Sequence, residues 1–383
     1  MATVAVKKPS ITTIVVLGIL VALMLLGLVT GGYRLFVGLG KTTNLSDAYP
    51  WGLWIGFDFF LIAFSGGAFT LSAIVIIFNQ PRYRDIERLM VLTGWLGYVS
   101  VLMILLVDLG RPDRFYHFLI YPNVHSPLFE ISWCILLYTI VLTLEFAPAL
   151  FEGLRKPKIA RIIHAFIVPI TITGVTLSIL HQSTLGTLYL AMPAKLHALW
   201  HTPMLPLFFF ISSVGMGMST VILVTLAAHR SIGRKLSANT LNALGSMAKA
   251  SVWVWALYLA LKLEDLILAG ELKKAFTFDA QSIWFLGELV IGVILPIILY
   301  AQPRVRRSQS GLMWTAILTT LGTFLNRFNV TLTGQAVVEG ASYTPYWMEL
   351  TIQAGVLAAV ILAWYLAARF LPCLLYTSPS PRD

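Results

Sequence analysis

Charged residues are scarce in this sequence. Asp, Glu, Lys and Arg make up 11% of the 383 residues, whereas a soluble domain carries about 25%. This scarcity argues against a soluble globular enzyme. Hydrophobic residues reach 58% and the mean hydropathy is +0.82, and a membrane-crossing helix needs roughly 20 apolar residues in a row. The sequence therefore predicts an integral membrane protein without a separate soluble domain.

Cysteine is almost absent, which restricts the redox groups that the chain can hold. Cys134 and Cys373 are the two cysteines, whereas an iron–sulfur cluster normally takes four thiolates. No CxxCH haem-attachment motif occurs. His197 and His201 have the i, i+4 spacing of some metal sites, but no H-E-x-x-H glutamate accompanies them. We interpret them as interfacial histidines beside Trp200. The other histidines form no mid-membrane pair, so we expect no metal, haem or iron–sulfur cluster in this chain.

Ten long apolar runs predict an all-α membrane protein of ten transmembrane helices, in one domain over residues 1–372. The predicted spans are 12–36, 51–78, 87–108, 127–151, 159–181, 203–229, 239–268, 279–301, 309–330 and 345–371. Acidic residues at matching places in spans 2–5 and 6–9 favour two related four-helix bundles plus flanking helices. Ten helices without a repeat remain the alternative. Residues 373–383 follow the last span abruptly and are expected to be a non-native tail.

Basic residues are distributed unequally between the two sides of the predicted bundle. Of the 27 Lys and Arg residues, 17 flank one side and 7 the other. Because positively charged loops stay in the cytoplasm, this bias predicts cytoplasmic termini and places the 109–126 and 182–202 loops outside. The net charge of +10 is explained by these short loops, so it does not indicate a nucleic-acid partner.

Charged side chains inside the predicted spans are the main functional signal. A charge at the bilayer centre costs about 2.5–3.5 kcal/mol on insertion scales, and such residues are functional hypotheses by default. They are Asp58, Asp108, Glu130, Glu145, Lys262, Glu264, Asp265, Glu288, Arg327 and Glu349. A purely structural anchor needs none of them.

Asp58 is the sharpest case, because it stands about two turns inside span 2, before the small residues Ser65, Gly66 and Gly67. Small residues let helices approach closely. One interpretation is a proton-accepting carboxylate that faces an internal cavity. The alternative is a buried carboxylate paired with Arg327 or a hydroxyl for packing.

Three further residues extend the proton-handling hypothesis. Glu130 begins span 4 and Glu288 lies in span 8, whereas His181 and its neighbour Gln182 are placed at the outer end of span 5. A histidine near its ordinary pKa exchanges protons at physiological pH. If protons come from the cytoplasm, the buried charges Glu264, Asp265, Glu288 and Arg327 are candidates for lining their path.

The segment VDLGRPDRFYH, residues 107–117, leaves span 3 on the outer side. Gly110 and Pro112 end the helix, and Asp108 is predicted to pair with Arg111 or Arg114. This ion-pair corner has two interpretations, which are a surface beside a redox site or partner and a lock that only holds the fold.

Several strings of the sequence resemble one known family. They are PWGLWIGFDFF, VDLGRPDRFY, SPLFEISW, LEFAPALFE, ILHQSTLGTLYL, KLHALWHTPMLPLFFFISS, NRFNV and YTPYWMEL, in this order over essentially 1–372. They resemble the NrfD/polysulfide-reductase membrane-subunit family, most closely its HybB branch, the integral membrane subunit of a nickel–iron hydrogenase. GRPDRF is also similar to the wider family.

The resemblance implies a haem-free, quinone-reactive subunit of an oxidoreductase complex in a bacterial or archaeal cytoplasmic membrane, inactive without its partners. It implies an extracytoplasmic iron–sulfur ferredoxin-like subunit and a catalytic subunit, of hydrogenase or similar type, with menaquinone or ubiquinone as the quinone. The family's acidic and histidine positions correspond to Asp58, Glu130, His181 and Glu288. The expected quinone pocket is lined by Trp51, Trp54, Trp133 and Gln182. A secondary transporter and a passive membrane anchor remain the alternatives.

Overall fold

The computed structural model describes residues 11–191, 195–233, 235–337 and 342–370, and all regular structure in these residues is helical. The long helices are α1 (Ile11–Val37), α2 (Leu53–Ser72), α3 (Arg84–Asp108), α5 (Pro127–Gly153), α6 (Pro157–Ala165), α7 (Ile167–Leu190), α8 (Leu205–Ile232), α9 (Ala238–Leu268), α10 (Ala280–Leu289), α11 (Leu295–Ala301), α13 (Gln309–Thr331) and α14 (Trp347–Phe370). Helices α4 (His117–Ile120) and α12 (Pro303–Arg306) are single turns. The predicted all-helical class is therefore confirmed.

Membrane-spanning character differs among these helices. Six of them, counting the α10–α11 stretch as one, are long and apolar enough to cross a membrane, and a seventh span results if the bent pair α6–α7 is counted as one. The predicted number of ten is not confirmed by this criterion. Helices α2, α9 and α13 lie outside the set. Helices α9 and α13 carry buried polar side chains, among them Lys262 and Arg327, which lower the hydropathy of a helix without facing lipid.

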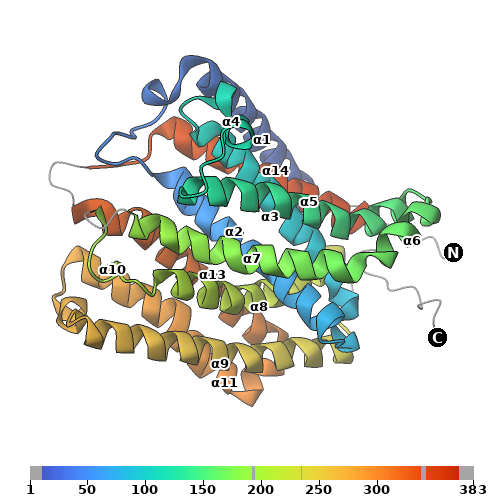
Figure 1. Cartoon of the computed structure of the whole chain (residues 1–383). Helices are drawn as coiled ribbons and strands as arrows, with labels where there is room; N and C mark the ends of the chain where they lie inside the picture. Colours follow the sequence, from blue (N-terminus) through green and yellow to red (C-terminus); the bar gives the residue numbers. More distant parts are fainter. Residues whose placement is uncertain (1–10, 192–194, 234, 338–341, 371–383) are drawn as a thin grey trace.

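The long helices run back and forth between two ends of the bundle (Figure 1). We call one end the loop end, because it holds the long connections 109–126 and 195–204. The opposite end holds α6, and we call it the α6 end. Helices α2 and α8 pack against each other at the centre, with α3, α7, α9 and α13 around them.

Helices α1 and α14 pack against each other at the periphery. Gly27 and Gly355 make this contact, since a Cβ added to Gly27 would lie 2.6 Å from the Gly355 Cα. Close approach of this kind needs small residues on both helices. The apolar side chains of α1 are largely exposed, as expected for a helix that faces lipid.

Three helices are irregular. Helix α2 continues into a π-helical segment, Ala73–Ile77, and a second π-helical segment, Val290–Ile294, separates α10 from α11. Helices α6 and α7 meet at an angle of 63°. Such interruptions in a helix often mark functional sites.

Helix α7 also differs from the predicted span 159–181. It ends at Leu190, so His181 lies well inside the helix and not at its end. The run ILHQSTLGTLYL contains enough polar residues to suggest a span end. In the structure these polar side chains face other helices, and the helix continues.

Candidate functional site

A buried polar cluster lies between α2, α3, α5 and α7. We call it the Asp58–His181 cluster, and its members are Asp58, Tyr98, Tyr138, His181 and Gln182. The Tyr98 hydroxyl lies 3.0 Å from the His181 Nδ1. The Tyr138 ring packs edge-on against Tyr98, with 4.3 Å between ring centroids. Asp58 is 2% exposed, and its charge acts on Tyr98. Tyr98 therefore links two predicted residues that are far apart in the sequence, since it contacts His181 and is subject to the charge of Asp58.

Three atoms of this cluster are buried and have no hydrogen-bond partner among the described residues. They are Asp58 Oδ1, His181 Nε2 and Gln182 Oε1. The Gln182 Nε2 donates to the Ile62 carbonyl oxygen at 3.0 Å, which holds the side chain against α2. Leaving a buried polar atom unpaired costs about 1–3 kcal/mol. The cluster is therefore arranged to receive water or a polar ligand.

Glu130 lies on the loop-end side of this cluster. Its Oε1 accepts a hydrogen bond of 2.7 Å from the Thr184 hydroxyl. Thr184 follows His181 by three residues on α7, so it lies about one helical turn closer to the loop end. Glu130 thus contacts α7 about one turn away from His181 and has no direct bond to it among the described contacts.

The four predicted pocket residues have different contacts. Trp51 packs edge-on against Tyr189 at 5.2 Å, and Trp133 contacts the ring of Phe118. Trp54 instead donates from its indole nitrogen to the Glu349 carbonyl oxygen at 3.1 Å. Of the four, Gln182 belongs to the Asp58–His181 cluster, while Trp54 fastens α2 to α14.

Glu288 forms a second buried centre, on α10 immediately before the π-helical segment. Its carboxylate accepts hydrogen bonds from Trp200 Nε1 at 3.2 and 3.3 Å, Asn326 Nδ2 at 3.0 Å and Asn329 Nδ2 at 2.6 Å. The asparagines come from α13, and Trp200 comes from the 195–204 connection. Both carboxylate oxygens of Glu288 accept hydrogen bonds, and these bonds hold the carboxylate in place.

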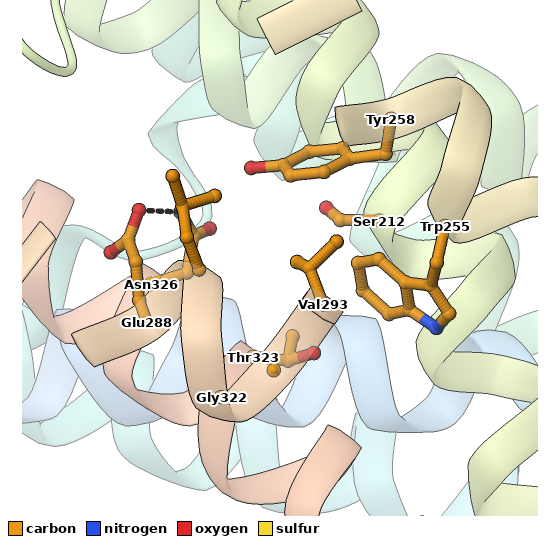
Figure 2. A pocket seen from close by; sticks show the side chains of 10 residues that line it. Ser212, Trp255, Tyr258, Glu288, Val293, Gly322, Thr323 and Asn326 are labelled. Atoms are coloured by element: carbon orange, nitrogen blue, oxygen red, sulfur yellow. Dashed lines mark hydrogen bonds between the residues drawn. The ribbon is translucent and has the colours of Figure 1, made fainter. Parts of the chain in front are cut away.

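A narrow pocket adjoins Glu288 (Figure 2). Trp255 and Tyr258 of α9, Ser212 of α8 and Val293 of the π-helical segment enclose it. The cavity volume is about 10 Å³, which is enough for about one water molecule. The pocket is therefore of a size for water or a proton relay, and too small for an aromatic ligand.

Two buried cations stand beside the Glu288 centre. The Lys262 ammonium donates to the Leu199 carbonyl oxygen at 3.0 Å. Arg327 donates to the Phe209 carbonyl oxygen at 3.2 Å and to Ser212 Oγ at 2.9 Å. Arg327 forms no ion pair with Asp58 among the described contacts, so the alternative interpretation of Asp58 as its partner is wrong.

The other two charges predicted to be buried have different surroundings. Asp265 accepts a 2.6 Å hydrogen bond from Thr202, which ties α9 to the 195–204 connection. Glu264 is exposed on the surface of the bundle. The prediction of a buried Glu264 is wrong, because its neighbours Lys262 and Asp265 take the inward positions of the helix.

The predicted ion-pair corner also forms differently. Arg111 pairs with Asp113, at 3.0 and 2.9 Å, and Arg114 lies 4.0 Å from the same carboxylate. The hydrogen bond from Arg111 lowers the pKa of Asp113 below its ordinary value. Asp108 does not pair with either arginine. The opposite charge that acts on Asp108 is Arg34 of α1, which is fully buried and donates to the Leu109 carbonyl oxygen at 2.5 Å.

Sequence reasoning missed several of these residues. Tyr98 and Tyr138 carry no sequence signal, because buried tyrosines are common in helices. Asn326 and Asn329 stand in the string NRFNV, where the spacing i, i+3 places both on one face of α13. That spacing was a detectable signal. Arg34 near the end of an apolar run has the pattern of an ordinary interfacial arginine.

The histidines do not fit a haem held between facing helices. His181 is fully buried in the bundle, and its Nδ1 is already bonded to Tyr98. The remaining histidines of the described residues lie in connections, in α4 or α6, or near the end of α8. No group of three or more metal-binding side chains occurs in the part of the chain that the structure describes.

Comparisons with known proteins identify the family of this chain. The family "Polysulphide reductase, NrfD" matches residues 41–339. A protein of Nitratidesulfovibrio vulgaris strain Hildenborough is 35% identical over 370 residues, covering 94% of each chain. The probable Ni/Fe-hydrogenase 2 b-type cytochrome subunit of Escherichia coli K12 is 31% identical over 351 residues, covering 89% of this chain and 88% of that one. The integral membrane subunit of the menaquinone reductase of the same Nitratidesulfovibrio strain is 30% identical over 369 residues, covering 89% and 87%. This chain is an integral membrane protein that belongs to the polysulphide reductase NrfD family.

Proposed function

We propose that this chain is the quinone-reactive membrane subunit of a respiratory redox complex. It passes electrons between an extracytoplasmic iron–sulfur partner and the quinone pool. The observation that carries the proposal is the Asp58–His181 cluster, in which three buried polar atoms lack partners among the described residues. A relative that is 30% identical is named for menaquinone reduction, and another for a hydrogenase.

The cluster suits a group that takes up protons as it is reduced. When the Tyr98 hydroxyl donates to His181 Nδ1, the neutral imidazole carries its proton on Nε2. That N–H is then a buried donor without a partner in the described part of the chain, suited to a carbonyl oxygen. Asp58 acts on Tyr98 electrostatically, and in this proposal it is the source of the proton that replaces the one Tyr98 gives up. General acid catalysis needs this type of positioned donor.

Electrons must come from a partner in this scheme. The described residues offer no set of side chains for a metal centre. The name of the Escherichia coli relative includes a b-type cytochrome, but the histidines that the structure describes do not fit a haem between facing helices. Reduction of a quinone to a quinol takes up two electrons and two protons, so the chain's own contribution is binding and proton delivery.

We further propose that all ten predicted spans cross the cytoplasmic membrane, with both termini in the cytoplasm. The loop end would then face outward, toward the iron–sulfur and catalytic subunits. The larger number of Lys and Arg residues at the α6 end supports this orientation. Helices α9 and α13 would cross with their buried polar side chains turned toward other helices.

Purification of the chain with its native partners in mild detergent tests the proposal. Mass spectrometry of the preparation should identify an iron–sulfur subunit, a catalytic subunit and extractable quinone. A partner complex without quinone would point to a passive anchor. A chain without redox partners that catalyses solute uptake alone would point to a transporter. Either result would refute the proposal.

A further inference from the structure

Polar pairs follow the seam between α5 and the antiparallel α6–α7 segment from one end of the bundle to the other. They are Glu130–Thr184, Tyr138–Ser178, Glu145–Thr171 and Glu152–His164. Successive members stand seven or eight residues apart on α5 and six or seven apart on α6–α7. This spacing returns to the same helix face every two turns. The seam therefore links the Asp58–His181 cluster with the α6 end.

A cavity opens on this seam near the α6 end. Its lining includes Ser72, Glu87, Arg88, Glu145, Pro148 and His164. The cavity volume is about 80 Å³, several times the minimum that one water molecule needs. The π-helical segment 73–77, Pro148 inside α5 and the bend between α6 and α7 surround it. These irregularities leave the room that regular helices would close.

Oxygen atoms without partners among the described residues face this cavity. Ser72 is 1% exposed, and its hydroxyl has no hydrogen-bond partner in that part of the chain. The Glu145 Oε1 accepts from the Thr171 hydroxyl at 2.7 Å, whereas its Oε2 is buried and unpartnered. The cavity therefore presents acceptors, which water or a bound proton would satisfy.

Two carboxyl groups line the cavity. The titratable groups in its lining are Glu87 and Arg88 on α3, Glu145 on α5 and His164 on α6; the π-helical segment and α7 contribute none. Behind them, Glu152 on α5 pairs with Arg88 and His164, and Arg84 acts electrostatically on Glu87. Arg88 is engaged by Glu152 at 2.7 Å. Glu87 and Glu145 act on each other electrostatically. Two neighbouring carboxyl groups in a low-dielectric site favour sharing a proton over carrying two negative charges.

We propose that the cavity between Glu87, Glu145 and Ser72 is a proton-loading site that takes protons from the water at the α6 end. In each cycle one carboxylate oxygen gains a proton from water, and the same proton leaves along the α5–α7 seam. The delivery of this proton to the Asp58–His181 cluster rests on the proposed function. A metal ion is the less suitable occupant, since the described residues contain no group of three metal-binding side chains.

Transfer along the seam needs bridging water. The Glu145–Thr171 and Tyr138–Ser178 pairs are seven residues apart on each helix, about 10 Å along the axis. Leu142 stands between them on α5 and is fully buried. The Leu142 side chain separates the proton-loading site from the Asp58–His181 cluster. The site therefore exchanges protons with the water at the α6 end independently of that cluster.

Labelling of the intact complex with dicyclohexylcarbodiimide tests the site. This reagent adds to a protonated carboxylic acid in an apolar setting and leaves an acylurea on it. Peptide mass spectrometry should find the adduct on Glu87 or Glu145, with a yield that falls as the pH rises. The single variants E87Q and E145Q should each reduce labelling in this pair, and the double variant should abolish it. The variant E264Q, at an exposed carboxyl, should leave the labelling of Glu87 and Glu145 unchanged.

Two results would overturn the proposal. Absence of any adduct on both residues over the whole pH range would exclude a protonated carboxyl pair. Protection by sodium ions at constant pH would indicate a cation site instead. The labelling requires no quinone turnover, so it can fail while quinone still co-purifies with the chain. Conversely, labelling of a preparation without quinone or redox partners would leave the site standing and remove the proposed function.

Proton delivery is tested separately with the whole complex in liposomes. E145Q keeps the acceptor for Thr171 but cannot exchange a proton. We expect it to retain bound quinone and to lose most proton uptake from the α6 side, while E264Q keeps both. Unchanged proton uptake in the E145Q complex would refute delivery through this site.

Discussion

The hydroxyl of Tyr98 and the Nδ1 of His181 lie 3.0 Å apart in the interior of the bundle. This contact joins α3 to α7 and directs the other ring nitrogen, Nε2, to a position without a partner among the described residues. When the Tyr98 hydroxyl donates to Nδ1, the proton of the neutral imidazole lies on Nε2, so this contact couples the hydroxyl to the protonation of the other ring nitrogen.

The first prediction concerns this pair. The variants H181Q and Y98F should lower quinone turnover by the reconstituted complex by about 10²-fold or more, the range for loss of a positioned acid–base group. His229 offers a matched control, because its Nδ1 contacts the Thr225 carbonyl of its own helix. Turnover by H229Q should stay near that of the native complex. Equal activity in H181Q and H229Q would contradict the role of His181.

The second prediction concerns the donors to Glu288. Asn329 donates the shortest of its hydrogen bonds, at 2.6 Å, so N329L leaves a buried carboxylate with fewer donors. We expect a loss of about 1–3 kcal/mol in the free energy of unfolding, measured by thermal or denaturant unfolding in detergent. E288Q should be milder in this assay, because the amide oxygen still accepts. A larger loss in E288Q than in N329L would contradict this account.

The third prediction concerns the close approach of α13 to the π-helical segment Val290–Ile294. A Cβ added to Gly292 would lie 2.6 Å from the Gly322 Cα, and backbone atoms cannot yield as side chains do. G292A should destabilise the protein by about 1–3 kcal/mol through overpacking. G287A is the control, because a Cβ added to Gly287 would have no neighbouring atom within 4 Å, and alanine favours a helix. A stable G292A protein would show that the two segments can separate.

The fourth prediction concerns the corner after α3. Arg34 is fully buried and reaches the Leu109 carbonyl oxygen, whereas Arg111 is exposed and pairs with Asp113. R34M should therefore lower the thermal unfolding midpoint clearly, while R111M should have little effect, since solvent screens an exposed ion pair. The reverse order would restore the predicted role of Arg111 as the lock.

The fifth prediction is the pH dependence of that exposed pair. Because the hydrogen bond from Arg111 lowers the pKa of Asp113, the pair's small contribution is present at neutral pH. It is lost only as the pH falls through this lowered pKa. Carboxyl NMR shifts of an isotope-labelled protein should place the titration of Asp113 below the ordinary value, and R111M should return it. An ordinary pKa in the native protein would contradict the contact.

The candidate site was predicted in part. The sequence selects Asp58 and Glu288 because a charged residue in an apolar run is costly unless it serves a purpose, and it selects His181 as a proton-exchanging group beside Gln182 at the expected outer end of a span. All three are buried in the structure. Glu264 was selected by the same argument and is exposed. The sequence shows that a charged residue lies in a span, but it does not show whether its side chain points into the bundle or toward the surface.

Sequence alone was enough to establish that this chain is a helical membrane protein of the NrfD family, because long apolar runs and an ordered set of motifs are local features. Which polar groups meet depends on the tertiary structure. It pairs Tyr98 with His181, places three donors around Glu288 and joins Arg34 to the end of α3. These contacts join segments far apart along the chain, and helix packing sets their partners. Hydropathy does not reveal such pairing, because it depends only on residue type. A polar residue has the same hydropathy whether it faces another helix or the surface.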